Sequence, residues 1–374
     1  MTDLEHLVIT VVLFFLVLGT LVLVHELGHF LSAKALEVRV LEFGIGFPPR
    51  ARVLRSTGET LWTLNWLPLG GFVKLDGEDG DHSEDRGSFA GRWLPTQVGI
   101  LVAGVVMNVV LGFVLFVLIA WQLSPVFGVV VPQNGVQPGS PAEQAGLVGG
   151  DILIGVNGRR FDIFADADIL TTIRNDIGQT IQLEVQHADG SDVTIPVALR
   201  SASQVDDSHG PLGIFVPAGS GSSFEAVPTT FTGTHPLGEA IGLGAAETAR
   251  AGGLIVGALG GLVAGFATNP TAPPAASGPI GIAYEIGQVF FSSGWAGLLF
   301  LAGLLSVNLA VVNILPFPPL DGGRILVLVI KRLARGQMSL RAEQLTYLVG
   351  FVFLFAFILW ISGFDVARGL GLTQ

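Results

Sequence analysis

Long apolar stretches alternate with polar ones along this chain. Charged residues are absent from residues 7–24, 94–142, 286–320 and 344–364. A helix needs about 20 apolar residues to cross the hydrocarbon core of a bilayer, so each stretch can hold a span. The pattern predicts a polytopic α-helical membrane protein of about four transmembrane helices, placed near residues 5–33, 95–123, 295–329 and 343–363.

The polar stretch between the first two predicted helices favours β structure. Its segments 39–47, 51–56, 60–67 and 70–78 alternate apolar and polar residues and are separated by Gly and Pro turns. Such short alternating runs are typical of strands. We therefore expect a small sheet between the first two spans.

The longer polar stretch after the second span predicts a compact α+β module over residues 127–200. Strand-like segments lie at 127–131, 150–158, 180–186 and 192–200, and helix-like segments at 139–147 and 164–177. An Asp189-Gly190 pair between the last two strands is a strong hairpin signal. Residues 201–235, rich in Gly, Ser, Thr and Pro, are expected to form a linker.

Residues 236–267 are apolar but rich in Gly and Ala, and they include a few charges. On a helix, Glu239, Ala246 and Arg250 share one face and leave the opposite face apolar. This amphipathic pattern favours a helix that lies in the membrane interface over a fifth span.

Composition agrees with a membrane protein. Of the 374 residues, 50% are hydrophobic and 13% are charged, whereas soluble domains carry about 25% charged residues. The net charge of −11 and the lack of a basic patch argue against nucleic acid as a partner. Cysteine is absent, which excludes disulfides and thiolate metal sites. The acidic cluster 78–85 is expected to be a solvated loop; calcium binding is the lesser alternative, since the spacing fits no EF-hand.

Positive charges indicate on which side of the membrane each loop lies. Lysine and arginine concentrate in residues 34–92 and 331–341 and are sparse in residues 125–290. Cytoplasmic loops carry the excess of these residues. The first two regions are therefore expected in the cytoplasm, and the α+β module outside it.

The sequence HELGH ends the first apolar stretch and forms an H-E-x-x-H motif, with His25, Glu26 and His29. Positions i and i+4 of a helix share a face, so both imidazoles can reach one metal ion. Glu26 is the usual base for a metal-bound water in this motif, and Zn²⁺ fits the donors best. Ionisable residues inside a membrane are costly and tend to be functional. In the alternative interpretation the span ends at Val24, but this does not explain why the two histidines are four residues apart.

A catalytic zinc ion usually needs a third protein ligand, and Asp321 is the best candidate. It follows the uncharged stretch 286–320, whose final PFPP sequence must break the helix. Non-helical backbone at membrane depth is tolerated where protein or a water-filled cavity surrounds it. The break therefore predicts a polar cavity in which Asp321 can face the histidines. Its alternative role is a helix cap paired with Arg324.

Several motifs follow one another over most of the chain: HELGH, FGIGF, PLGGFVKLDGE, AGVVMN, SGPIGIA and NLAVVNILPFPPLDGGR. In this set the sequence resembles the site-2 protease family of intramembrane zinc metalloproteases, in its bacterial branch of regulated intramembrane proteolysis. The piece GSPAEQAGL followed by GDILIGVNG resembles a PDZ domain of the bacterial protease type. The chain departs from the family pattern in having room for a single PDZ module and in Val105, where many members have proline.

The resemblance implies His25, His29 and Asp321 as Zn²⁺ ligands and Glu26 as the general base. It also implies that residues 39–76 form a membrane-associated sheet that holds the substrate as an added strand. The substrate-binding residues implied in this way are Gly70, Gly71, Phe72, Asn308 and Asn313. Interhelical hydrogen bonding is the alternative role of the two asparagines.

The implied activity is hydrolysis of a peptide bond within or near the transmembrane segment of a single-span membrane protein, after a first cut by an upstream site-1-type protease. Anti-sigma factors and signal-peptide remnants are substrates by resemblance only. The chain is expected in a bacterial inner membrane, surrounded by lipid bilayer, with its active site near the cytoplasmic side. The extracytoplasmic PDZ module would bind a peptide or the substrate ectodomain; an inert α+β domain is the alternative.

Two other classes of protein remain open. A metal transporter would need several ligand sets along a pathway, and this sequence offers one. A catalytically silent membrane scaffold that presents a PDZ domain would not need Glu26 beside His25.

The predicted organisation begins with a first transmembrane helix (1–36), a cytoplasmic β region (37–92), a second helix (93–124) and the PDZ domain with its C-terminal strand (125–217). It continues with a linker and interfacial helix (218–290), a broken third helix (291–331), a cytoplasmic loop (332–342), a fourth helix (343–364) and a tail (365–374).

Overall fold

The computed structural model describes residues 2–56, 58–78, 85–165, 168–206, 209–215, 226–268, 276–334 and 339–369. It divides into two compact units. A helical unit contains residues 1–116, 244–291 and 298–374, and an α+β unit contains residues 117–243 and 292–297. Residues 79–84 of the acidic cluster lie outside the described residues, so the expectation of a solvated loop stays a prediction.

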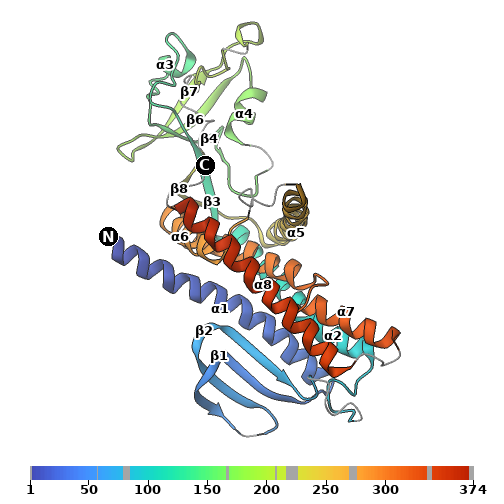
Figure 1. The fold of residues 1–374 in the computed structure, drawn as a ribbon. Coiled ribbons are helices and arrows are strands. Elements are labelled where there is room, and N and C mark those ends of the chain that lie inside the picture. The colour runs from blue at the N-terminus through green and yellow to red at the C-terminus, as the bar shows by residue number, and fades with distance from the viewer. Residues whose placement is uncertain are drawn as a thin grey trace. The chain divides into compact units, whose positions relative to one another are not determined.

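The helical unit is built on α1 (Asp3–Ala35), with α2 (Leu94–Leu118) and α6 (Pro279–Asn313) packed against it (Figure 1). Large aliphatic side chains of all three helices form one buried cluster. Near its start α6 runs opposite to α1, because Gly287 lies against Thr10 and Phe291 stacks on His6. The helix is interrupted at Gly294, and just after it ends Asp321 reaches His25 near the end of α1. The second part of α6, residues 295–313, therefore runs in the same direction as α1.

Helix α2 runs opposite to the second part of α6. Ser306 donates a hydrogen bond to the backbone oxygen of Asn108, and one helical turn further along α2 Gly112 faces Gly303 and Val307. Helix α8 (Leu340–Gly369) begins near the end of α6, where Gly350 lies against Pro318. Asp365 near the end of α8 accepts hydrogen bonds from the backbone N–H groups of Gly278 and Gly281 at 3.3 and 2.8 Å.

The expected break in the third apolar segment lies between α6 and the short helix α7 (Asp321–Leu333). Helix α6 itself starts at Pro279, inside the residues expected to be linker and interfacial helix (218–290), and it departs from helical geometry at Gly294. Proline at the first helical position needs no N–H partner. The Asp365 carboxylate caps this start from another helix, a contact that no local pattern reveals.

Helix α5 (Leu237–Thr268) matches the helix expected at 236–267. Glu239, Ala246 and Arg250 are exposed on one face, as expected. Glu247 lies beside this face, at the edge of the buried side of the helix, where it accepts two hydrogen bonds from Arg250. Ala251 on the buried face packs with Phe116 and Val307.

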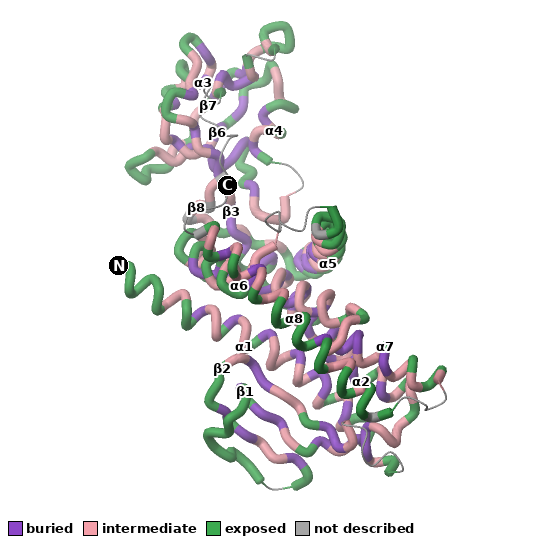
Figure 2. The backbone as a smooth tube through the Cα atoms, in the orientation of Figure 1, coloured by how far each residue is buried: buried purple, intermediate pink, exposed green. Residues whose placement is uncertain are grey.

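Among the described residues, five helices are long and apolar enough to cross a membrane. They are Asp3–Ala35, Leu94–Leu123, Leu237–Gly265, Pro279–Asn313 and Arg341–Arg368. Three of them correspond to predicted spans, and Pro279–Asn313 overlaps the third predicted span over residues 295–313. Leu237–Gly265 is the helix expected to lie in the interface. Figure 2 shows that much of α8 is exposed, and its large apolar residues Leu348, Phe351 and Phe355 are more than half exposed.

The β region is a hairpin of two long strands, β1 (Val40–Arg55) and β2 (Leu61–Leu75), paired antiparallel. Residues 42–45 of β1 have partners on both sides, in residues 61–64 and 71–74 of β2. The four short strands expected from the sequence are thus parts of two long, bent strands. Left-handed glycines lie within each of them, Gly46 with φ of 81° and Gly70 with φ of 99°.

The α+β unit has a sheet in the order β7-β6-β4-β3-β8, with β5 paired to β4. Its strands are β3 (Ser124–Val130), β4 (Ile152–Val156), β5 (Arg159–Arg160), β6 (Thr180–Gln186), β7 (Asp192–Ala198) and β8 (Ala226–Gly233). Its helical pieces are a π-helical turn (Ile119–Leu123), α3 (Pro141–Gln144), α4 (Ile169–Asn175) and a 3₁₀ turn (Ala202–Gln204). Leu153, Ile181 and Leu183 form the centre of its core.

The expected strands and both helices of the module are present, although α4 is shorter than the segment 164–177. Strand β8 was not expected, since it lies within the residues assigned to a linker. It pairs antiparallel with β3, from Ser124↔Gly233 to Val129↔Ala226. The sheet of this unit therefore extends beyond residue 217, and its first and last strands are neighbours.

Candidate metal centre

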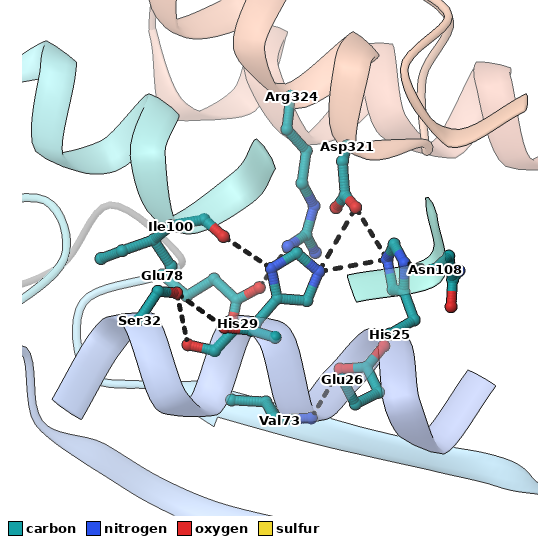
Figure 3. Close-up of polar contacts among 11 residues, drawn as sticks. His25, Glu26, His29, Ser32, Val73, Glu78, Ile100, Asn108, Asp321 and Arg324 are labelled. Carbon is teal, nitrogen blue, oxygen red and sulfur yellow. Dashed lines mark hydrogen bonds and ion pairs between the residues drawn. The ribbon is translucent and has the colours of Figure 1, made fainter. Parts of the chain in front are cut away.

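Three polar side chains of the helical unit converge on one point. His25 and His29 lie one turn apart on α1, and Asp321 is the first residue of α7 (Figure 3). His25 Nε2 lies 2.9 Å from Asp321 Oδ2 and 3.2 Å from His29 Nε2, and the third side of this triangle is 3.3 Å. All three residues are buried, with 6 to 8% of their surface exposed.

This triangle has the size of a zinc site. Ligand atoms about 2.05 Å from a tetrahedral zinc ion lie about 3.3–3.4 Å from one another. Two of the observed separations match this spacing, and the third is a few tenths of an ångström shorter. Two imidazole nitrogens and one carboxylate oxygen are donors that Zn²⁺ accepts, and three protein ligands leave a fourth position for water. The residues present therefore fit the ion.

The outer nitrogen of each imidazole faces α2. His29 Nδ1 lies 2.8 Å from the backbone oxygen of Ile100, so it carries a proton and leaves Nε2 free for a metal. His25 Nδ1 lies 3.2 Å from the side-chain amide of Asn108. Both rings are thus oriented from behind by the second helix.

The break between α6 and α7 places Asp321 opposite the histidines. Gly322 and Gly323 follow it directly, and a Cβ at either position would lie within 2.5 Å of the preceding loop backbone. Only glycine permits α7 to start so close to the end of α6. Leu320 occupies the N-cap position of α7, and Arg324 pairs with Glu78 instead of Asp321. The geometry thus gives no support to the alternative role of Asp321 as a cap paired with Arg324.

Glu26 lies beside His25 at the contact between α1 and β2. Its Oε2 accepts a hydrogen bond from the backbone N–H of Val73 at 3.1 Å (Figure 3). This contact depends on close packing one turn earlier, where Gly70 has no space for a Cβ against Val22. The sequence LGGFVK therefore lets β2 approach the helix that carries the motif.

A cavity of about 360 Å³ adjoins the three converging residues. Its lining includes Glu26, Phe72, Asn313 and the Glu78–Arg324 ion pair. The break before Asp321 was predicted to need such a polar cavity. The cavity is large enough for a stretch of peptide backbone together with water.

The predicted substrate residues lie in different places. Phe72 and Asn313 line the cavity, whereas Asn308 is not among its lining residues. Gly70 and Gly71 pack against Val22 and Leu23 of α1 and so shape the wall behind it. Their contacts are compatible with a substrate role for Phe72 and Asn313 and with a packing role for the two glycines.

Sequence reasoning gave no role to Gly104, Asn108 or Val73. It placed Glu78 in a solvated acidic loop, whereas Glu78 pairs with Arg324 and lines the cavity. The motif AGVVMN contains Gly104 and Asn108, four residues apart and hence on one helical face. That spacing was available in the sequence, but nothing in it indicated which face of α2 meets the histidines. The contacts of Val73 and Glu78 depend on the fold of the β region.

Comparison with known proteins places this geometry in a family. Residues 13–357 match the family described as Peptidase family M50. A Clostridium perfringens protein, CPE1693, provisionally named a zinc metalloprotease, is 31% identical over 353 residues, which cover 94% of this chain and 96% of that protein. Zinc metalloprotease RasP of Geobacillus kaustophilus is 26% identical over 446 residues, with 96% and 98% covered.

The family match extends over both halves of the candidate site, from the histidines of α1 to Asp321. The relatives align over nearly their whole length, and their names agree with the metal that the donor atoms favour. The chain therefore belongs to peptidase family M50, the site-2 protease family, and is a zinc metalloprotease of the membrane.

Proposed function

We propose that this zinc metalloprotease hydrolyses a peptide bond within or next to the transmembrane segment of a single-span membrane protein. The observation that carries the proposal is the convergence of His25, His29 and Asp321 beside a cavity in the helical unit. The histidines lie on α1, which is long and apolar enough to cross a membrane. A site built into such helices is suited to a substrate that is itself held in the bilayer.

The residues of the cavity have separable roles in this reaction. His25, His29 and Asp321 would hold a zinc ion, which polarises the scissile carbonyl and lowers the pKa of water to about 7. Glu26 takes the proton from the attacking water and passes it to the leaving amine. Asn313 is placed to donate a hydrogen bond to the substrate backbone.

The edge of β2 supports binding of the substrate as an added strand. Val73 and Leu75 lie two residues apart, so their N–H groups point to the same edge. The first donates to Glu26 Oε2 and the second to Glu78 Oε2, at 3.1 and 3.2 Å. Substrate carbonyls that pair with this edge would replace both carboxylates. Docking of an unwound substrate would thereby release Glu26 to act as the base.

We also propose four membrane crossings, made by α1, α2, α6 and α8. The end of α2 and the start of the second part of α6, residues 295–313, lie on the same side, because α1 and this part of α6 run in one direction and α2 in the other. A crossing by α5 would need a second crossing before residue 295. The first part of α6 (residues 279–293) is about 22 Å long and too short for it, so α5 would lie in the interface. The excess of basic residues in 34–92 and 331–341 favours a cytoplasmic location for the end of α1 and the metal centre.

The α+β unit would then be extracytoplasmic, in the inner membrane of a bacterium, and would act as a PDZ domain. Its strand and helix order supports this assignment. Its ligand would be a peptide or the ectodomain of a substrate already trimmed by a site-1-type protease. An anti-sigma factor or a signal-peptide remnant would suit the resulting two-step cleavage.

The test is cleavage of a single-span model substrate in liposomes by the full chain and by Glu26→Gln, with bound zinc measured in both. We expect the variant to keep its zinc and to lose about 10²–10⁴-fold in rate, the usual contribution of a general base. Equal cleavage by both proteins would contradict the role of Glu26. A wild-type chain that binds no zinc would favour a silent scaffold, and zinc uptake into the liposomes would favour a transporter.

A further inference from the structure

One face of α2 carries three residues that each lie against one or both of the histidines of the proposed metal site. Ile100, Gly104 and Asn108 recur every four positions, so they form a stripe along the helix. Ile100 contacts His29 through its backbone oxygen and Asn108 contacts His25 through its amide. Between them, a Cβ on Gly104 would lie 2.5 Å from His29 Nε2 and 2.8 Å from His25 Cε1.

The two imidazoles are held in different ways. His29 has a fixed acceptor at Nδ1, because a backbone oxygen can only accept a hydrogen bond. Asn108 is adaptable, since its amide has a donor end and an acceptor end. In the structure Nδ2 lies 3.2 Å from His25 Nδ1, and Oδ1 is buried without a hydrogen-bond partner among the described residues.

His25 Nε2 is directed at Asp321 Oδ2, so it is the nitrogen that would bind the metal. A histidine that binds a metal through Nε2 carries its proton on Nδ1 and donates it to an acceptor. Rotation of the amide by half a turn exchanges its two ends and places Oδ1 opposite Nδ1.

We propose that Asn108 is a positioning residue of the metal centre: its amide oxygen accepts a hydrogen bond from His25 Nδ1 and holds Nε2 toward the metal. This inference rests on the proposed metal site. Asn108 is fully buried in α2, one turn after Gly104, whose backbone lies against both imidazoles. The amide therefore has a defined position from which to orient the ring.

The experiment measures the dissociation constant of zinc by chelator competition and the visible spectrum of the Co²⁺ form, both on the full chain in detergent. Asn108→Leu keeps the side-chain volume but removes the acceptor, and we expect zinc binding about 10–100-fold weaker and an altered Co²⁺ spectrum. Asn108→Asp keeps an acceptor in the same place, and we expect an affinity within about threefold of wild type or tighter.

Ser306→Ala is the matched control, because it removes a hydrogen bond to the Asn108 backbone without touching the imidazole. Its zinc affinity and Co²⁺ spectrum should equal those of the wild type. The proposal is overturned if Asn108→Leu binds zinc as tightly as wild type with the same spectrum. The proposal is also overturned if Asn108→Asp binds zinc tenfold or more weakly than the wild type. This second result tests the proposal even if the leucine variant does not fold. Failure of the wild type itself to bind zinc would contradict the proposed metal site instead.

Discussion

At Gly104 the absence of a side chain determines how closely α2 approaches the histidines. Gly28 of the HELGH motif has the same effect on α1, because a Cβ there would lie 2.4 Å from the backbone oxygen of Ala103. Two glycines on facing helices thus allow the contact that lets Asn108 and Ile100 reach the imidazoles. The geometry of the metal centre therefore depends on the close approach of the α1 and α2 backbones as well as on the ligand side chains.

We predict that Gly104→Ala lowers the melting temperature of the protein and weakens zinc binding. The added methyl group would overlap with His29, and such overpacking costs about 1–3 kcal/mol of stability. Gly99 is the control on the same helix, since a Cβ there meets nothing within 4 Å. Gly99→Ala should be neutral or slightly stabilising, because alanine has the higher helix propensity. Equal effects of the two substitutions on zinc affinity would contradict the close approach at Gly104.

At the scale of elements, the hydrophobic pattern located the long helices but missed the start of α6 and the whole of strand β8. Helix α6 starts at Pro279 because Asp365, on a different helix, accepts hydrogen bonds from its first turn. Strand β8 is composed of Val, Thr and Phe among Pro and Gly, and it becomes a strand because β3 offers it a partner. Both elements depend on distant segments, which a local pattern cannot include.

A histidine joins two strands of the α+β unit and makes their stability depend on pH. His187 Nδ1, just after β6, lies 2.9 Å from the buried Asp151 Oδ1, just before β4. This hydrogen bond, with a further attraction to Asp189, raises the pKa of His187 above its ordinary value of 6.5. A raised pKa in the folded state means that protonated His187 stabilises the fold.

We therefore predict that β4 and β6 are more protected at about pH 6 than at about pH 8.5. The contribution of His187 is fully present below about pH 6.5 and is lost as the pH rises through the raised pKa of the folded state. Hydrogen exchange of the two strands in the full chain, corrected for intrinsic rates, measures this difference. His187→Gln should reduce it, and His235, whose pKa is also raised by hydrogen bonds to Asp162 and Glu239, accounts for a remainder. Stronger protection at the higher pH would contradict the sign of the effect.

At the scale of the whole molecule, the α+β unit is inserted into the chain through two adjacent strands. Ser124 at the start of β3 pairs with Gly233 at the end of β8. Paired residues of antiparallel strands lie about 4.5–5.5 Å apart. A short Gly-Ser linker can therefore replace residues 125–232. Removal of 127–200 alone would leave β8 without its partner.

We predict that this replacement keeps the protease active and relaxes its selectivity. If the unit excludes substrates that retain their ectodomain, cleavage of an untrimmed single-span substrate should rise by about tenfold or more, equivalent to about 1.4 kcal/mol. Cleavage of the trimmed substrate should stay the same, and Glu26→Gln in the shortened chain should abolish both. Unchanged selectivity in liposomes would contradict a filtering role.

The sequence by itself predicted the long apolar helices, strands β3, β4, β6 and β7 of the module and the four residues at the centre of the proposed site. Apolar length, residue periodicity and the H-E-x-x-H spacing are local properties, and the broken segment before Asp321 pointed to its place in the site. Only the tertiary structure decided which backbone and amide groups orient the histidines, where Glu26 is held, and that β8 closes the module. Those features depend on contacts between segments far apart in the chain, so no single stretch of sequence contains them.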